Sequence, residues 1–113
     1  MHLEPKKYLY DVREAALRIV DFTSGKTLDE YRGDAMLRSA VERQFEIIGE
    51  ALSQLAKRDH KFVARISEHR RIIAFRNILI HGYVDIDERL VWDIVQTKLP
   101  VPRQETETLL NEA

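Results

Sequence analysis

The chain has 113 residues, of which 44% are hydrophobic and 33% charged, and its net charge is −1. This length fits one domain with a single core over residues 1–113, and the absence of cysteine excludes disulfides, thiolate catalysis and cysteine-bound metals. A charge near zero supplies no overall basic field, so any contact with nucleic acid needs a local patch. The first residues lack the apolar core of a signal peptide and no apolar run reaches the length of a membrane span, so we expect a cytoplasmic location and no membrane partner.

The first half of the chain predicts two long helices joined by a short one. Apolar residues recur at three- and four-residue steps over residues 5–24, which indicates an amphipathic helix. A helical turn follows, with Thr27 as its cap and Glu30 as the capping-box partner. Asp34 is the expected N-cap of the longest periodic stretch, which ends in a polar segment near residue 57. Only four glycines and three prolines interrupt the chain, which also favours long helices.

The long second helix carries two features of interest. Gly49 lies in its interior, where glycine costs about 1 kcal/mol relative to alanine, and could allow a neighbouring helix to come close. A charged edge repeats at four-residue steps, and its members are Arg38, Glu42, Glu46 and Glu50. This edge is either a solvated face or a set in which one or two glutamates orient an arginine of a functional site.

The second half predicts further helices. Ser67 is the expected cap of a third helix that ends at Gly82, and either Asp85 or Asp87 caps a fourth that runs from residue 88 to about 98. Pro100 and Pro102 are expected to interrupt that helix, and residues 103–113 can form a last one. No stretch reads as a strand outside a helical pattern. The sequence therefore predicts an all-α fold, a bundle of four to five helices.

The third helix ends in the stretch Arg76-Asn77-Ile78-Leu79-Ile80-His81-Gly82-Tyr83. Arginine supplies a fixed positive charge and histidine can move a proton near neutral pH, so the pair suits phosphodiester chemistry. At about 100° per residue, Arg76 and His81 lie roughly 140° apart on a straight helix, whereas Arg76 and Tyr83 lie roughly 20° apart. Either Gly82 ends the helix early enough to swing His81 and Tyr83 round, or a second copy of the chain completes the site across a two-fold axis. A histidine that merely caps the helix end is the structural alternative.

Other candidate residues carry weaker signals. His60 and His69 are too far apart for a local zinc pattern and no cysteine assists them, so we expect no metal site. A basic run lies before and within the third helix, as a solvated face or a local RNA-facing patch; it comprises Arg65, His69, Arg70, Arg71 and Arg76. Trp92 and Tyr83 could stack on bases, although Trp92 suits a place in the core.

Two stretches together resemble the HepT-like group of minimal HEPN proteins. The first is Arg38-Ser39-Ala40-Val41-Glu42-Arg43-Gln44-Phe45-Glu46-Ile47-Ile48-Gly49-Glu50-Ala51, and the second is the motif above, which is similar to the R-x4-H-x-Y form of the HEPN signature. The resemblance covers nearly the whole chain in family order. The family's usual proline before the third helix is absent, and Ser67-Glu68-His69 stands in its place.

The resemblance implies a symmetric homodimer of HEPN-type helical bundles, often the toxin of a toxin–antitoxin pair. It implies a metal-independent endoribonuclease without a cofactor, in which Arg76 stabilises the phosphate and His81 is the general base or acid, both facing their mates across the dimer axis. Asn77 and Glu46 would orient the site. The partner would be an MntA-type minimal nucleotidyltransferase that silences the toxin by transferring AMP onto the motif tyrosine, here Tyr83. Two alternatives stay open: a non-catalytic nucleotide- or substrate-binding subunit of such a nucleotidyltransferase, and a helical dimer with no activity.

Overall fold

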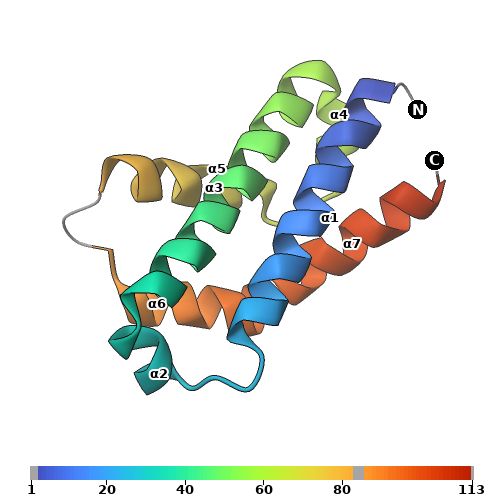
Figure 1. Cartoon of the computed structure of the whole chain (residues 1–113). Helices are drawn as coiled ribbons and strands as arrows, with labels where there is room; N and C mark the ends of the chain where they lie inside the picture. The colour runs from blue at the N-terminus through green and yellow to red at the C-terminus, as the bar shows by residue number, and fades with distance from the viewer. Residues whose placement is uncertain (1–2, 83–85, 113) are drawn as a thin grey trace.

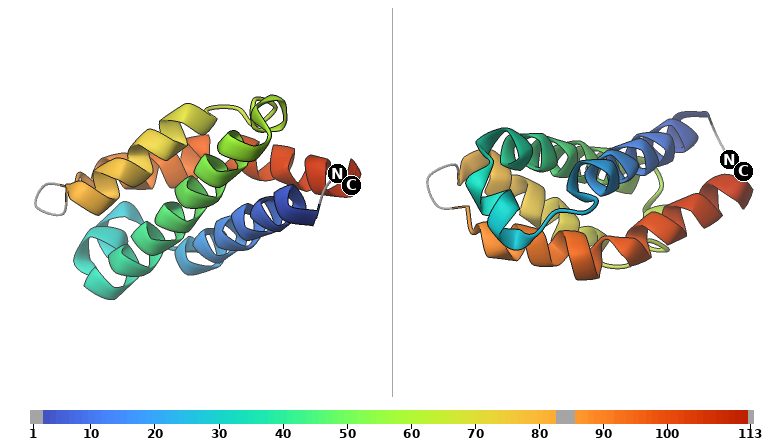
Figure 2. Two further views of the ribbon diagram at one scale, coloured as in Figure 1. Left: turned by 90° about the horizontal axis from the view of Figure 1, so that it is seen from above. Right: turned by 60° about the horizontal axis from the view of Figure 1, so that its bottom comes forward.

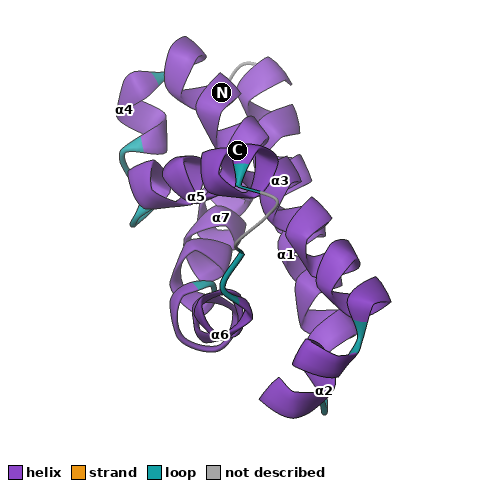
Figure 3. Cartoon of the chain, turned by 90° about the vertical axis from the view of Figure 1, so that its left-hand side faces the viewer, coloured by secondary structure: helices purple, strands orange, loops and turns teal. Residues whose placement is uncertain are grey.

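The computed structural model describes residues 3–82 and 86–112, and the side chains from residue 5 onward within them. Over these ranges every regular element is a helix, as Figure 3 shows. Figure 1 shows α1 (Leu3–Thr23) and α3 (Ala35–Arg58) side by side and antiparallel, connected through the short α2 (Leu28–Gly33). α3 is the central helix, because it packs against α1 on one side and against α5 (His69–His81) on another. The predicted all-α class is confirmed.

The core lies between α1, α3 and the C-terminal helices. Its largest fully buried side chains come from six elements and the loop before α5, and include Leu9, Ile19, Tyr31, Phe45, Ile48, Leu52, Leu55, Ile66 and Leu109. The apolar rows that predicted the first two long helices are the rows that meet here, since an amphipathic helix is stabilised mainly by burying its apolar face. None of the helices in the described ranges has the length and apolar character that crossing a membrane would need.

The helix starts in the first half follow the local capping signals. The Thr27 side chain accepts from the Glu30 backbone N–H at 3.1 Å, and the Glu30 carboxylate accepts from the Thr27 N–H at 3.0 Å, so the predicted capping box is present. Asp34 caps α3 by accepting from the Leu37 N–H at 3.0 Å. After α3 the short α4 (His60–Val63) turns the chain, with Val63 buried. Both predicted caps are confirmed.

The predicted cap of α5 is wrong. The residue at the N-cap is Glu68, which has a left-handed backbone (φ 66°) and makes no side-chain capping bond. Ser67 is instead bound to Glu105, which lies 38 positions later on α7 (Pro100–Glu112). The carboxylate of Glu105 accepts from the Ser67 N–H at 2.8 Å and from its hydroxyl at 2.7 Å. Ser67 therefore bonds to a residue distant in sequence and does not cap α5 as local chemistry would predict.

From Glu88 to Glu112 the chain forms three helical elements in succession. Asp87 caps α6 (Glu88–Asp93) and accepts from the N–H groups of Arg89 and Leu90, whereas the alternative cap, Asp85, lies outside the described residues. The helix then widens into a π-helical segment, η1 (Ile94–Lys98), and α7 follows after Leu99. Figure 2 shows α7 in red, running to the C-terminus near the N-terminal end of α1. The expected interruption falls where α7 begins: η1 ends at Lys98, and both prolines stand in the first turn of α7, where the missing N–H has no helical partner to lose. The last helix starts at Pro100, three residues before the predicted position.

Candidate active site

The motif residues lie at the end of α5, which stays helical through His81. Gly82 is the C-cap and its backbone N–H bonds back to Ile78. Since the helix does not end before His81, it does not swing this histidine towards Arg76. The sequence allowed either an early helix end at Gly82 or a second copy of the chain. The early end does not reorient His81, and Tyr83 lies outside the described residues.

Arg76 and His81 face different surroundings. The Arg76 side chain is only 14% exposed and is turned towards α3, whereas His81 and Asn77 are exposed. His81 shares an outer surface of α5 with Ala74, Asn77 and Ile78, all exposed and all within about 100° of arc on a helix. We call these four residues the open face of α5. Arg76 stands on the far side of the helix from Ala74, so one chain does not bring Arg76 and His81 to the same point.

Gly49 lets α5 lie directly on α3 at Arg76. A Cβ at position 49 would lie 2.3 Å from the Arg76 Cβ and 2.7 Å from its Cγ, far inside van der Waals contact. It would also lie 3.4 Å from the backbone oxygen of Ile72. The prediction that Gly49 allows a neighbouring helix to come close is confirmed, and the neighbour is the helix that carries the motif.

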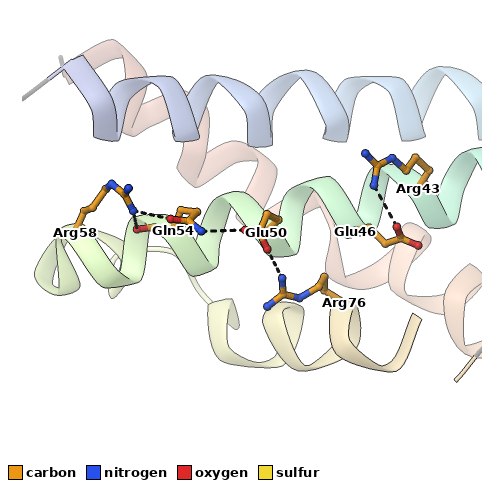
Figure 4. Close-up of polar contacts among 6 residues, drawn as sticks. All are labelled: Arg43, Glu46, Glu50, Gln54, Arg58 and Arg76. Atoms are coloured by element: carbon orange, nitrogen blue, oxygen red, sulfur yellow. Dashed lines mark hydrogen bonds and ion pairs between the residues drawn. The ribbon is translucent and has the colours of Figure 1, made fainter. Parts of the chain in front are cut away.

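Glu50, the residue after Gly49, binds the guanidinium of Arg76. Figure 4 shows an Arg76 terminal nitrogen donating to one Glu50 oxygen, while the other oxygen accepts from the Gln54 amide at 3.0 Å. The Gln54 oxygen in turn accepts from Arg58 at 2.6 Å. The Nε of Arg76 is buried and has no hydrogen-bond acceptor among the described residues. A buried donor without an acceptor costs about 1–3 kcal/mol, and functional sites are among the places where such donors persist.

The pKa of Glu50 is lowered from its ordinary value. The hydrogen bond from Gln54 is the largest cause, the positive charge and hydrogen bond of Arg76 act in the same direction, and desolvation opposes them. The Glu50 side chain is 55% exposed, so solvent screens much of this interaction. The carboxylate is therefore ionised at neutral pH and holds Arg76 mainly by fixing its direction.

The other glutamates of the α3 edge have different partners. Glu46, which the sequence assigns a supporting role, lies one turn before Glu50 and pairs with Arg43 at 3.3 Å (Figure 4). The sequence allowed this edge to be a solvated face or a source of glutamates that orient an arginine. Glu50, which binds Arg76, fits the second interpretation. Sequence reasoning placed Glu50 only as one of a row, although its position beside Gly49 was a usable signal.

The basic run before and within α5 is partly neutralised inside the chain. Arg65 makes a bidentate pair with Glu112 at 3.0 and 2.7 Å, and Arg71 pairs with Glu68 at 3.2 Å. Trp92 packs against the core with its ring 5.3 Å from that of Tyr31, as the core reading predicted. Within the described ranges no three His, Asp or Glu side chains gather as metal ligands. The polar chemistry that the structure assembles around the motif therefore centres on Arg76, Glu50 and the exposed His81.

The fold and the site define a class: an all-helical protein whose candidate phosphodiester site is carried by one helix end and its central neighbour. Comparison with known proteins identifies its family. Residues 12–109 match the family model for HepT-like ribonucleases. A candidate RNase of Methanocaldococcus jannaschii is 37% identical over 90% of this chain and 93% of its own length, and a second from the same organism is 34% identical over 96% and 92%.

A candidate ribonuclease HepT of Thermococcus cleftensis is 34% identical, over 84% of this chain and 86% of its own length. No solved structure gives a significant match. The family match covers most of the chain and includes both α3 and the motif of α5. The chain belongs to the HepT-like ribonuclease family, and its enzyme class is that of an RNA-cleaving protein.

Proposed function

We propose that the chain is a metal-independent endoribonuclease that works as a symmetric homodimer. Its active site combines Arg76 of one copy with His81 of the other. The observation that carries this proposal is the placement of the two residues on different sides of a continuous α5, with Arg76 held against α3 and His81 on the open face. A two-fold axis beside the edge of α5 between Arg76 and His81, where Asn77 and Ile80 are exposed, would bring His81 of one copy towards Arg76 of the other and supply the convergence that a single helix lacks.

The composition of the outer side of α5 supports such an interface. Ile78 on the open face is 53% exposed, and Ile80, which lies between Asn77 and Arg76 around the helix, is 45% exposed. Ala74 on the open face is exposed as well. Apolar side chains grouped with a few polar ones are typical of surfaces that bind another protein. Asn77 on the same face would donate or accept across the axis, and Glu46 would contribute to the charge balance of the site from α3.

The chemistry is transphosphorylation. His81 takes the proton of a ribose 2′-hydroxyl, the 2′-oxygen attacks phosphorus, and the bond from phosphorus to the 5′-oxygen breaks. The leaving 5′-oxygen takes up a proton from water and His81 then releases its proton to solvent, so the proton count balances. Arg76 stabilises the negative charge that develops on the phosphate oxygens. The products are a 2′,3′-cyclic phosphate and a 5′-hydroxyl, and DNA, which lacks the attacking hydroxyl, is not cut.

Mixed dimers test the composite site. Arg76→Ala and His81→Ala chains should each be inactive on RNA in the presence of EDTA. After the two are mixed in equal amounts and allowed to exchange, half of the dimers are mixed, and each holds one intact site of its two. We therefore expect about a quarter of the wild-type rate, from random pairing across the two-fold axis. No recovery, in a mixture whose mixed dimers are verified by native mass, would refute the composite site.

We propose further that the chain is the toxin of a toxin–antitoxin pair and that an MntA-type nucleotidyltransferase inactivates it by attaching AMP to Tyr83. The position of Tyr83 in the motif, two residues after His81, supports this assignment. A bulky anionic group there would repel a phosphate substrate. Intact mass with and without the co-expressed partner tests the idea: one or more added AMP units are expected on the wild type and none on Tyr83→Phe. An unmodified wild type in the active partner's presence would refute it.

The burial of Arg76 favours one alternative, in which this residue has a structural role only. With 14% of its side chain exposed and its guanidinium bound to Glu50, Arg76 could serve structure alone, and the chain would be a non-catalytic subunit that presents a nucleotide or substrate to a nucleotidyltransferase. The isolated dimer would then leave RNA intact, while the complex would still transfer nucleotide. Cleavage that depends on His81 decides between the two.

A further inference from the structure

An apolar slot of about 200 Å³ opens beside α5, on the side that faces α6 and η1. Its walls are formed by apolar and aromatic side chains from four elements, namely Phe45, Ile72, Phe75, Leu90 and Ile94. Charged side chains of both signs stand with them at the slot: Glu68, Arg71, Asp93 and Lys98. A smaller hollow shares five of these residues and continues inward to Ile48 and Pro102. The proposed reaction makes no use of this slot.

Two irregularities of the backbone meet at the slot. Glu68 is the one non-glycine residue with positive φ in the described ranges, and η1, which supplies Ile94 and Lys98, is the π-helical segment. A left-handed non-glycine residue is strained, and such strain is retained most often where it serves a function. Single π-helical turns inside helices are likewise frequent at functional sites. Both distortions shape one and the same cavity, which distinguishes it from an ordinary gap between helices.

The shape and polarity of the slot identify the class of its ligand. Its volume is below the range of pockets that hold a whole drug-sized ligand, so it suits one ring system. Its apolar walls, with Phe75 packed edge-on to Phe45 at 5.3 Å, would receive the faces of a flat ring. The rim offers donors and acceptors together, since Arg71 and Lys98 donate while Glu68 and Asp93 accept. A nucleobase has this combination of flat apolar faces and a mixed polar edge, and its phosphate would stay outside near the two cations.

We propose that this slot binds a single unpaired base of the RNA substrate, at a nucleotide near the cleaved bond but not at it. The choice of RNA as the source of the base rests on the proposed ribonuclease activity. Ile72 and Phe75 precede His81 by nine and six residues on α5, which is roughly 9–14 Å along a helix. The slot would therefore select the strand by stacking and set which bond reaches His81. Cleavage should accordingly depend on one base at a fixed offset from the cut.

Substrates with one missing base test the offset. With the wild type, an abasic nucleotide at one fixed position from the cut should raise KM roughly tenfold or more, as loss of base stacking typically does. Leu90→Trp fills the slot from its mouth, where Leu90 is 47% exposed, so the fold should be kept. This variant should raise KM for intact RNA and lose the sensitivity to the abasic position. Val101→Trp, at a 54% exposed position of α7 outside the slot, is the matched control and should behave as the wild type.

A binding measurement separates this proposal from the ribonuclease activity. Adenosine or uridine 5′-monophosphate, added to the full-length wild type, should shift the methyl resonances of Ile72, Leu90 and Ile94, whereas those of Ile72 and Ile94 should stay in place in the Leu90→Trp protein. Methyl shifts without any RNA cleavage would support the slot and refute the ribonuclease. RNA cleavage with neither methyl shifts nor an abasic offset would refute the slot and leave the ribonuclease standing. Contacts from a second copy to these methyl groups, seen in a mixed-label dimer, would also refute it.

Discussion

Gly49→Ala is the sharpest test of how α3 positions Arg76. The added Cβ would lie 2.3 Å from the Arg76 Cβ, so the helices must separate by about 1.2 Å to reach ordinary carbon contact. The atom that must move is close to the α5 backbone and is not the far end of a flexible side chain. Overpacking of this kind costs about 1–3 kcal/mol, and here we expect about 3. The better helix propensity of alanine returns about 1 kcal/mol, so the net loss of stability should be about 2 kcal/mol.

The loss of activity should exceed the loss of stability. A shift of about 1 Å in a catalytic group can reduce the rate by about 100-fold, and Arg76 moves with α5. The assay is RNA cleavage at a temperature where denaturation curves show both proteins fully folded. Gly33→Ala is the matched control, because a Cβ there meets nothing within 4 Å, and it should leave rate and stability nearly unchanged. If Gly49→Ala were as stable and as active as Gly33→Ala, the inferred contact between α3 and Arg76 would be wrong.

Four further outcomes are expected. Glu50→Gln should reduce RNA cleavage about tenfold, because Arg76 loses its charge-assisted partner, whereas Glu46→Gln should keep most of the rate. Because the pKa of Glu50 is lowered, its pairing with Arg76 should be complete above the ordinary value of 4.5 and be lost only as pH falls through the lower pKa of the folded protein. NMR titration of the Glu50 carboxyl measures this pKa, and a midpoint at or above 4.5 would contradict the expectation. Tyr31→Phe should stabilise the protein by about 1 kcal/mol in denaturant unfolding, since the buried hydroxyl has no partner among the described residues and burial raises its pKa. Asp34→Ala should cost about 1 kcal/mol in the same measurement through loss of the α3 cap, and an unchanged midpoint would show that the cap contributes nothing.

The sequence was a good guide wherever the signal was local. The capping box of Thr27 and Glu30 and the cap of Asp34 join residues three apart, and the helix periods follow from which side chains the core buries. The failures involve distant partners. Ser67 bonds to Glu105, 38 residues away, and no residue near Ser67 in the sequence indicates this contact. The π-helical winding of η1 before Pro100 was likewise not predicted from the sequence.

In the candidate site too, the features set by local spacing were predictable and those set by helix packing were not. The angle between Arg76 and His81 follows from residue spacing alone, and the uninterrupted α5 confirms its premise. Glu46 and Glu50 stand on the same edge of α3, one turn apart, so the sequence alone does not tell which of them binds Arg76. The position of α5 along α3 decides it, and the partner is Glu50. Gly49 was the one local clue, since a glycine tolerated in a helix interior marks where another backbone comes near.

The spacing within the motif is the reason for proposing that a second chain completes the site. Residues four apart on a helix share a face, and an arginine and a histidine at that spacing would converge in one chain. The spacing here is five, which turns His81 roughly 140° from Arg76 and puts it on the open face. Arg76 gains rigidity from this, since it is fixed on Gly49 and bound to Glu50, while His81 keeps access to solvent. One straight helix cannot serve both requirements at one phosphate, whereas two such helices related by a two-fold axis can, because each would bring its exposed histidine to the other's fixed arginine.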